Sequence, residues 1–171
     1  MSNNIQQQTT INIQEKANLI WAIADKLVGV YKPHEYGNVI LPMCVIKRFE
    51  DTLAPTKQAV LDTNAKLDKD GIVVKKGFLE TAAGQQLYNL SPFTFQSLLN
   101  DPENIKENFE SYLNHFSENV IDIIHRMDFD RELQKMADNN VLYLVIKEFC
   151  TSKAYLGADL VTSVDMGYIF E

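Results

Sequence analysis

The chain contains few of the residues from which metal sites and covalent frameworks are usually built. It has two cysteines among 171 residues, too few for a disulfide framework or, by themselves, for a four-ligand zinc site. Cys44 and Cys150 lie in apolar runs, where an inert buried thiol is the expected state. No two of the histidines, His34, His115 and His125, are three or four residues apart, so the sequence has no helical metal-binding motif.

Glycine-rich turns for cofactors are also missing. None of the seven glycines belongs to a Gly-x-Gly sequence, which excludes the usual dinucleotide-binding turn and the P-loop. None of the five prolines follows an asparagine, so the Asn-Pro-Pro-aromatic motif of amino-group DNA methyltransferases is not present. From its own residues, the chain does not read as a catalytic unit.

Long apolar runs are absent as well. The longest, residues 19–24 and 141–146, have six residues each, whereas a membrane-spanning helix needs about 20. The N-terminal sequence MSNNIQQQTTINIQ is polar and lacks the apolar core of a signal peptide. We therefore expect a soluble, cytoplasmic protein with no membrane partner.

Positive charge is scarce. The net charge is −7 and the pI is near 5.0, which argues against a free-standing, nonspecific nucleic-acid binder. Residues 1–100 hold 10 basic and 9 acidic side chains, whereas residues 101–171 hold 6 and 14. This acidic second part is either an ordinary solvated surface, or a face that meets a basic partner or repels DNA.

The chain has the composition of a globular protein and the apolar spacing of a helical one. Hydrophobic residues make up 46% and charged residues 23%, and a chain of this length buries roughly 70% of its unfolded surface. After a polar, flexible lead over residues 1–11, a capping pattern of Asn12 and Glu15 predicts a helix over 13–28 that stops at Gly29. Its apolar residues recur at helical spacing: Ile13, Ala17, Ile20, Ala24, Leu27 and Val28.

The rest of the chain shows the same rhythm. Apolar stripes predict further helices over 34–53, 55–67, 78–87, 102–116, 117–127, 129–137 and 165–171. Pro42 either kinks the helix over 34–53 or divides it. Residues 72–74 fit a short strand or a loop edge, and 141–149 fits a buried strand as well as a helix, with helical neighbours favouring a helix. We expect one all-α domain of about seven or more helices over residues 12–171, with a short hairpin or loop near 71–77.

One stretch is richer in aromatic and basic side chains than a plain helical connection needs. The only tryptophan, Trp21, precedes the segment Tyr-Lys-Pro-His-Glu-Tyr-Gly at 31–37, and Lys47 and Arg48 follow. One interpretation is a solvated face in which Trp21 and Tyr36 are aromatic anchors of the core. The other is a contact surface for an anion or a partner, since such surfaces are enriched in Trp, Tyr and Arg.

The sequence of this stretch resembles a known family. Residues 15–27 (EKANLIWAIADKL), 31–42 (YKPHEYGNVILP) and 47–50 (KRFE) are similar to the N-terminal helical domain of the modification (M) subunit of type I restriction–modification systems. Residues 90–95, 114–120 and 166–171 support the resemblance in order and spacing. The resemblance extends over about residues 12–171.

The resemblance implies a function that the chain alone does not carry. A complete M subunit is a DNA adenine N6-methyltransferase that uses S-adenosylmethionine and assembles, two M subunits to one specificity (S) subunit, with restriction (R) subunits for cleavage. In that family the methyl-donor site and the Asn-Pro-Pro-aromatic motif lie in a following domain. The resemblance therefore implies a truncated chain or gene fragment, with no catalytic residue and no cofactor of its own. S-adenosylmethionine is expected in the missing catalytic domain.

The candidate contacts to phosphate or to a neighbouring subunit are four cations, Lys26, Lys32, Lys47 and Arg48. A coherent positive strip that includes the last two would favour a domain that clamps DNA. Scattered cations would favour the alternative, a helical protein–protein interaction module with no nucleic-acid contact. A third hypothesis, a Cys–His hydrolase, requires a cysteine beside a histidine in an open pocket.

Overall fold

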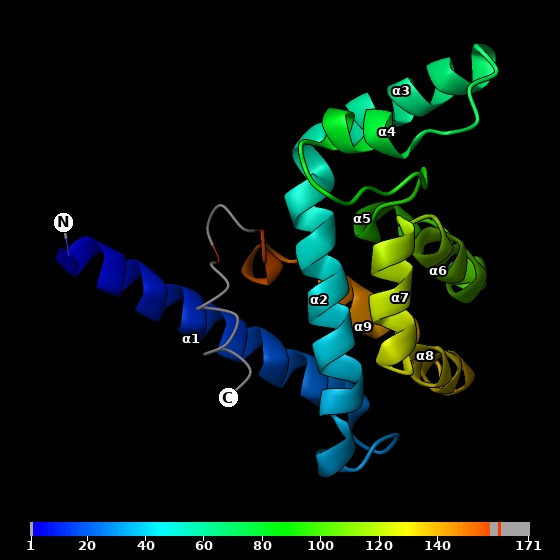
Figure 1. Ribbon diagram of the computed structural model, residues 1–171. Coiled ribbons are helices and arrows are strands. Elements are labelled where there is room, and N and C mark those ends of the chain that lie inside the picture. Colours follow the sequence, from blue (N-terminus) through cyan, green and yellow to red (C-terminus); the bar gives the residue numbers. More distant parts are fainter. Residues whose placement is uncertain (1, 158–160, 162–171) are drawn as a thin grey trace.

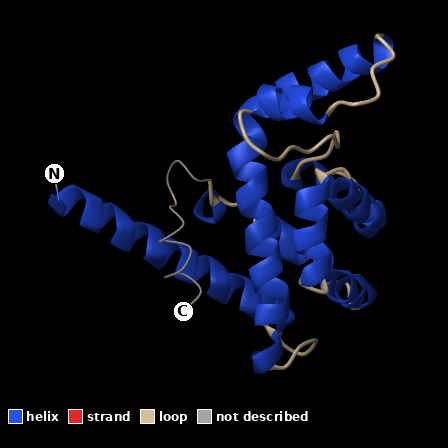
Figure 2. Cartoon of the chain, in the orientation of Figure 1, coloured by secondary structure: helices blue, strands red, loops and turns tan. Residues whose placement is uncertain are grey.

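The fold consists of helices that pack around one central helix. A computed structural model describes residues 2–157 and 161, with side chains from residue 13 onward. The α-helices are α1 (Ser2–Leu27), α2 (Gly37–Leu53), α3 (Lys57–Lys69), α4 (Lys76–Ala83), α5 (Phe95–Leu98), α6 (Ile105–Asn114), α7 (Glu118–Arg126), α8 (Phe129–Asp138) and α9 (Leu142–Glu148). Among the described residues, three short 3-10 helices lie between α-helices, η1 (Pro33–Glu35), η2 (Ala54–Thr56) and η3 (Pro102–Asn104), and a fourth, η4 (Ser152–Ala154), follows α9. The described residues form no β-strand, so the prediction of an all-α fold is confirmed (Figure 2).

The central helix is α2, and Figure 1 shows the other helices arranged along it. Helices α5 to α9 lie on one side, where α8 contacts α2 directly. Helix α1 crosses near one end of α2 and also packs on α9 and η4, while its N-terminal part extends beyond the body. At the other end of α2, helices α3 and α4 pack on each other and form a projecting arm.

An aromatic cluster fills the core beside α2. The Phe95 ring of the short helix α5 lies 5.8 Å from Phe109, 5.9 Å from Tyr112 and 6.1 Å from Phe149, each in an edge-to-face arrangement. These rings come from α5, from α6 and from the residue that follows α9, and all four side chains are fully buried. Edge-to-face pairs at this separation add to the free energy of burial. The cluster therefore fixes α5, which the sequence analysis missed because one turn shows no period.

The N-terminal helix is longer than its sequence pattern predicted. Helix α1 begins at Ser2, so the predicted start at residue 13 is wrong, and Asn12 and Glu15 lie inside the helix. The polar lead contains no proline or glycine, and extending an anchored helix by one residue costs far less than starting a new one. The predicted stop is confirmed: α1 ends at Leu27, and Gly29 takes a φ of 85°.

Most other predicted helices are confirmed with shifted ends. Helix α2 is continuous through Pro42, which lies near its first turn, where the missing N–H costs one hydrogen bond to the Asn38 carbonyl. Residues 72–74 form a loop rather than a strand. Helix α4 ends earlier than predicted, at the left-handed Gly84, and the segment after Val141 is helical. The predicted helix over 165–171 lies outside the described residues.

Replacing Phe95 with alanine tests the importance of the aromatic cluster. We expect Phe95→Ala to lower the free energy of unfolding by about 3–5 kcal/mol, because the substitution opens a cavity among three other rings. Phe78→Ala is the matched control, since Phe78 is 54% exposed on α4, and it should change stability by about 0.5 kcal/mol at most. Urea unfolding measures both, and equal midpoints would contradict the expectation.

Candidate functional site

A cluster of charged residues lies on one face of α2, where the sequence predicted contacts to phosphate. Lys47, Arg48 and Asp51 share this face because residues three and four apart in a helix are neighbours. The Lys47 amine donates to both carboxylate oxygens of Asp51, at 2.6 and 2.5 Å, and only 7% and 9% of these two residues is exposed. We call these three residues the α2 polar face.

The partners of the α2 polar face are backbone groups from the far end of the described chain. Asp51 Oδ2 accepts the N–H of Leu156 at 2.9 Å. Arg48 Nη1 donates to the carbonyl oxygens of Leu156 and Val161, at 3.1 and 2.5 Å. A buried ion pair is tolerated when its members have further hydrogen bonds, and the Leu156 N–H supplies one to Asp51.

Only part of the predicted cation set is on the surface. Lys47 and Arg48 point into the fold and bind groups of this chain, so they do not form the positive strip that a DNA clamp would favour. Lys26 is partly exposed and lies 3.9 Å from the Glu148 carboxylate. Lys32 is exposed and precedes η1. The surface cations of the set are therefore Lys26 and Lys32.

The two aromatic anchors have different environments. Tyr36 is half-buried and packs against the core. Trp21 is 71% exposed, so the prediction that it anchors the core is wrong. The sequence did not show that Trp21 is exposed, because residues 19–24 are all apolar. Periodicity identifies the buried face of a helix only where polar residues identify the exposed face. Trp21 lies on a solvent-facing stripe of α1 with Asn18 and Asp25, which we call the α1 outer face.

A second polar side chain with partners inside the fold, the partly buried Glu50, lies one position before Asp51. Glu50 Oε1 accepts the N–H of Phe95 at 2.8 Å and receives a side-chain hydrogen bond from Tyr112. Burial is the main reason that the pKa of Glu50 is raised above its usual value. Nearby, Lys57 donates to the Phe93 carbonyl at 2.5 Å and lies 5.2 Å from the centre of the Tyr112 ring. The sequence analysis missed Glu50 and Lys57, since their partners are distant in the chain.

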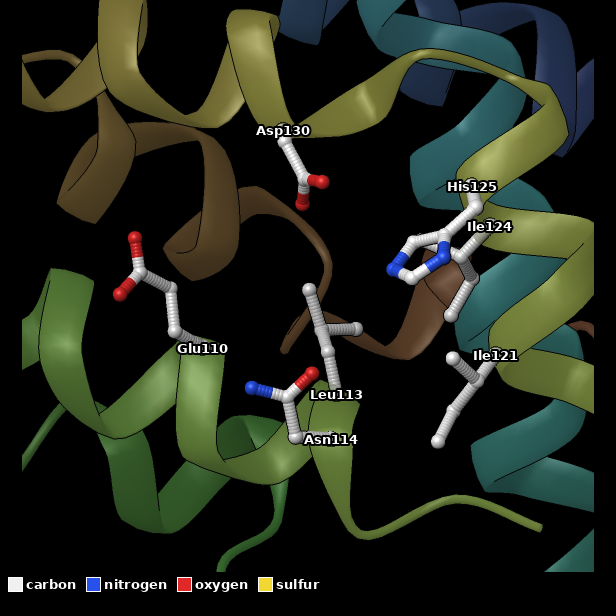
Figure 3. Close-up of a pocket in the computed structure, with 7 residues that line it drawn as sticks. All are labelled: Glu110, Leu113, Asn114, Ile121, Ile124, His125 and Asp130. Carbon is white, nitrogen blue, oxygen red and sulfur yellow. The ribbon is translucent and has the colours of Figure 1, made fainter. Parts of the chain in front are cut away.

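A surface pocket lies between α6, α7 and α8. Figure 3 shows the side chains that line it: Glu110, Leu113, Asn114, Ile121, Ile124, His125 and Asp130. Its volume is about 170 Å³, with an apolar floor and polar groups around the rim. The rim combines two carboxylates, Glu110 and Asp130, with the His125 imidazole.

The cysteines do not behave as nucleophiles. Burial raises the pKa of Cys44 to about 12 and that of Cys150 to about 11, and a thiol attacks only as its thiolate. The structure therefore gives no support to the Cys–His hydrolase hypothesis. Among residues 2–157 and 161, no group of three or more His, Cys, Asp or Glu residues is placed to hold a metal ion. Within the same residues, no helix has the length and apolar character needed to cross a bilayer.

Comparison with known proteins decides the family. The model of the family described as "HsdM N-terminal domain" matches residues 16–149. This chain belongs to the HsdM N-terminal domain family. The resemblance to the M subunit of type I restriction–modification systems is thereby confirmed. No curated protein and no solved structure matches the chain.

The matched range contains both surfaces described above. It begins at Lys16, runs through α2 and ends at Phe149, the last aromatic residue of the core cluster. The α1 outer face and the α2 polar face thus both belong to the HsdM N-terminal domain. The carbonyl groups that the α2 polar face holds, at Leu156 and Val161, lie just after the match.

The raised pKa of Glu50 predicts a pH dependence of stability. A carboxyl group whose pKa is higher in the folded protein stabilises the fold below its unfolded pKa of about 4.5, and this contribution is lost as pH rises through the folded pKa. Glu50→Gln retains an acceptor for the Phe95 N–H but does not titrate. We expect the difference in unfolding free energy, wild type minus Glu50→Gln, to fall as pH rises from 4 to about 7.

Urea unfolding at several pH values measures this difference. A substitution of an exposed carboxylate, Asp62→Asn on α3, is the control and should give a flatter difference. A wild-type advantage that grows with pH would show that Glu50 is stabilised as a carboxylate instead.

Proposed function

We propose that this HsdM N-terminal domain serves an intact M subunit as an assembly and DNA-positioning domain. It packs against the S subunit and the second M subunit and helps hold the duplex, while another domain carries out S-adenosylmethionine-dependent adenine N6 methylation. The R subunit joins the same complex for cleavage. The observation that carries the proposal is the exposed Trp21 on the α1 outer face, in a chain of this family.

The α1 outer face has the features of a protein contact. Tryptophan is among the residues most enriched at interface hot spots, and its large ring supplies contact area with little loss of conformational entropy. The opposite side of α1 is fixed to the body, because Leu19, Ile23 and Leu27 are buried in the core. A partner therefore meets a preformed surface and loses little free energy to ordering it.

The DNA-positioning role is supported by the chemistry of the reaction and by the surface cations. Adenine methylation requires the target base to be turned out of the helix, so the duplex must be gripped while this happens. Contacts to phosphate fix the register of a duplex without reading its sequence. In this domain Lys32 is exposed and Lys26 is partly exposed, so these two cations are the candidates for such contacts.

One observation favours the alternative function, a helical protein–protein interaction module without nucleic-acid contact. Two of the four predicted cations, Lys47 and Arg48, are occupied inside the domain. The two cations that remain would contribute less to DNA affinity than the roughly 6–10 phosphate contacts of a typical DNA-binding protein. The salt dependence of DNA binding separates the two functions.

Truncating Trp21 tests the assembly role. We expect Trp21→Ala to weaken binding of the intact M subunit to the S subunit by about 30-fold, the effect of losing an interface hot spot of about 2 kcal/mol. The unfolding midpoint should stay the same, because Trp21 is 71% exposed. Isothermal titration calorimetry measures the affinity, and Phe78→Ala on the α3–α4 arm is the aromatic control. Wild-type affinity in Trp21→Ala would remove the main support for the proposal.

Removing Lys26 and Lys32 tests the DNA-positioning role. In the intact M–S complex, each lost phosphate contact should reduce the slope of log affinity against log salt by about 1. The double substitution Lys26→Ala/Lys32→Ala should therefore flatten the slope, while Lys76→Ala, which removes a cation that is exposed on α4, should leave it unchanged. Identical slopes in all three proteins would favour the module without nucleic-acid contact.

A further inference from the structure

Leu156 is attached to α2 through both of its backbone polar groups. Its N–H donates to Asp51 Oδ2 at 2.9 Å, and its carbonyl oxygen accepts from Arg48 Nη1 at 3.1 Å. Asp51 and Arg48 are separated by three positions on α2, so they reach the same residue from one helix face. The Leu156 side chain is also buried, with 1% exposed. This residue therefore has one fixed position relative to α2.

The attachment continues on both sides of Leu156. Before it, the Lys16 amine of α1 donates to the Lys153 carbonyl at 2.6 Å. After it, Arg48 Nη1 also donates to the Val161 carbonyl at 2.5 Å. The Ala154 and Val161 side chains are 0% and 1% exposed. Side chains from α1 and α2 thus hold the backbone at three points between residues 153 and 161.

The chemistry of the α2 polar face suits a fixed attachment rather than contact with a ligand. The planar guanidinium of Arg48 presents several donors in a rigid fork, which a lysine amine does not reproduce. Lys47 neutralises Asp51, which allows this carboxylate to accept a backbone N–H in the interior. α2 is itself fixed, since Val39, Met43 and Ile46 are fully buried.

We infer that Arg48 and Asp51 are positioning residues for methyl transfer. They hold the backbone at Leu156 and Val161 against α2, and thereby restrict how this part of the domain is placed in an intact M subunit. This inference rests on the proposed function, because it requires that the placement of the domain matters to the reaction. In this role the two residues touch neither DNA nor S-adenosylmethionine. They act by restricting the geometry between this domain and the catalytic one.

The attachment itself can be tested with two variants of the 171-residue chain. They differ only in the side chain at position 51, which is leucine in one and asparagine in the other. In Lys47→Met/Asp51→Leu, the buried ion pair is replaced by apolar side chains, and the acceptor for Leu156 is lost. In Lys47→Met/Asp51→Asn, the ion pair is lost, but an amide oxygen remains as the acceptor. We expect the Leu156 amide to exchange its hydrogen about tenfold faster in the first variant than in the second.

Hydrogen exchange followed by NMR provides this comparison. Amides of α6 and α9, in the aromatic core, should be equally protected in both variants, which shows that the fold is retained. Equal exchange at Leu156 would overturn the inference at its first step, because the Asp51 acceptor would then not hold this segment.

The effect on the reaction is measured with the intact M subunit in its complex with the S subunit. We expect Lys47→Met/Asp51→Leu and Arg48→Ala to lower kcat for methylation by about tenfold or more, because misplacing the reacting groups slows a reaction that depends on orientation. The KM for DNA and the affinity for S-adenosylmethionine should remain within about twofold of the wild-type values. Lys47→Met/Asp51→Asn, which keeps the attachment, should restore kcat.

The possible results separate this inference from the proposed function. If Trp21→Ala loses assembly while the two Asp51 variants have equal kcat, the positioning inference is wrong and the assembly role stands. If Trp21→Ala and Arg48→Ala both leave assembly and methylation unchanged, the proposed function fails as well. A flatter salt slope of DNA binding in Arg48→Ala would also overturn the inference, since Arg48 would then contact phosphate directly.

Discussion

The buried ion pair between Lys47 and Asp51 is the interaction on which the arrangement of this domain depends. A carboxylate and an ammonium group in the interior each require a partner, and here each neutralises the other across one turn of α2. Asp51 Oδ2, which accepts from Lys47, also accepts a backbone N–H 105 residues further along the chain. The central helix is therefore both the apolar support for α8 and the polar attachment for the segment after α9. The same helix face that seemed suited to a nucleic acid is used to organise the protein.

Local sequence patterns predicted the parts of this fold that depend on local rules. Helices α6 to α8 show a clear alternation of buried and exposed positions, so their stripes identify them. Trp21 was misplaced because the run around it is apolar on every side, and residues 1–11 were assigned to a flexible lead because a polar helix has no stripe. The hydrogen bonds of Arg48 and of Glu50 were not predictable, since each depends on backbone groups brought close only by the folded chain. The sequence gives the charge of a basic side chain, but the group that this side chain binds is known only from the tertiary structure.

The two surfaces differ in what they contact: the α1 outer face is exposed to solvent, and the α2 polar face binds groups inside the domain. The α1 outer face presents a large aromatic ring to solvent on a helix that is otherwise fixed. The α2 polar face has no such exposure and holds this chain's own backbone. Helix α1 takes part in both, because Lys16 on its inner side contacts the same segment that α2 holds. A partner on the outer face of α1 would lie about one helix diameter, roughly 10 Å, from the segment that Lys16 contacts.

The loop between α3 and α4 has a practical consequence. Val73 and Val74 are 87% and 81% exposed there, while the helices on either side pack on each other along the arm. Exposed loop tips are the sites where folded proteins best tolerate cleavage and inserted residues. A fluorophore or an affinity tag placed at residues 73–74 would thus lie far from α1 along the molecule, and it would report on the assembled complex without entering the core (Figure 1).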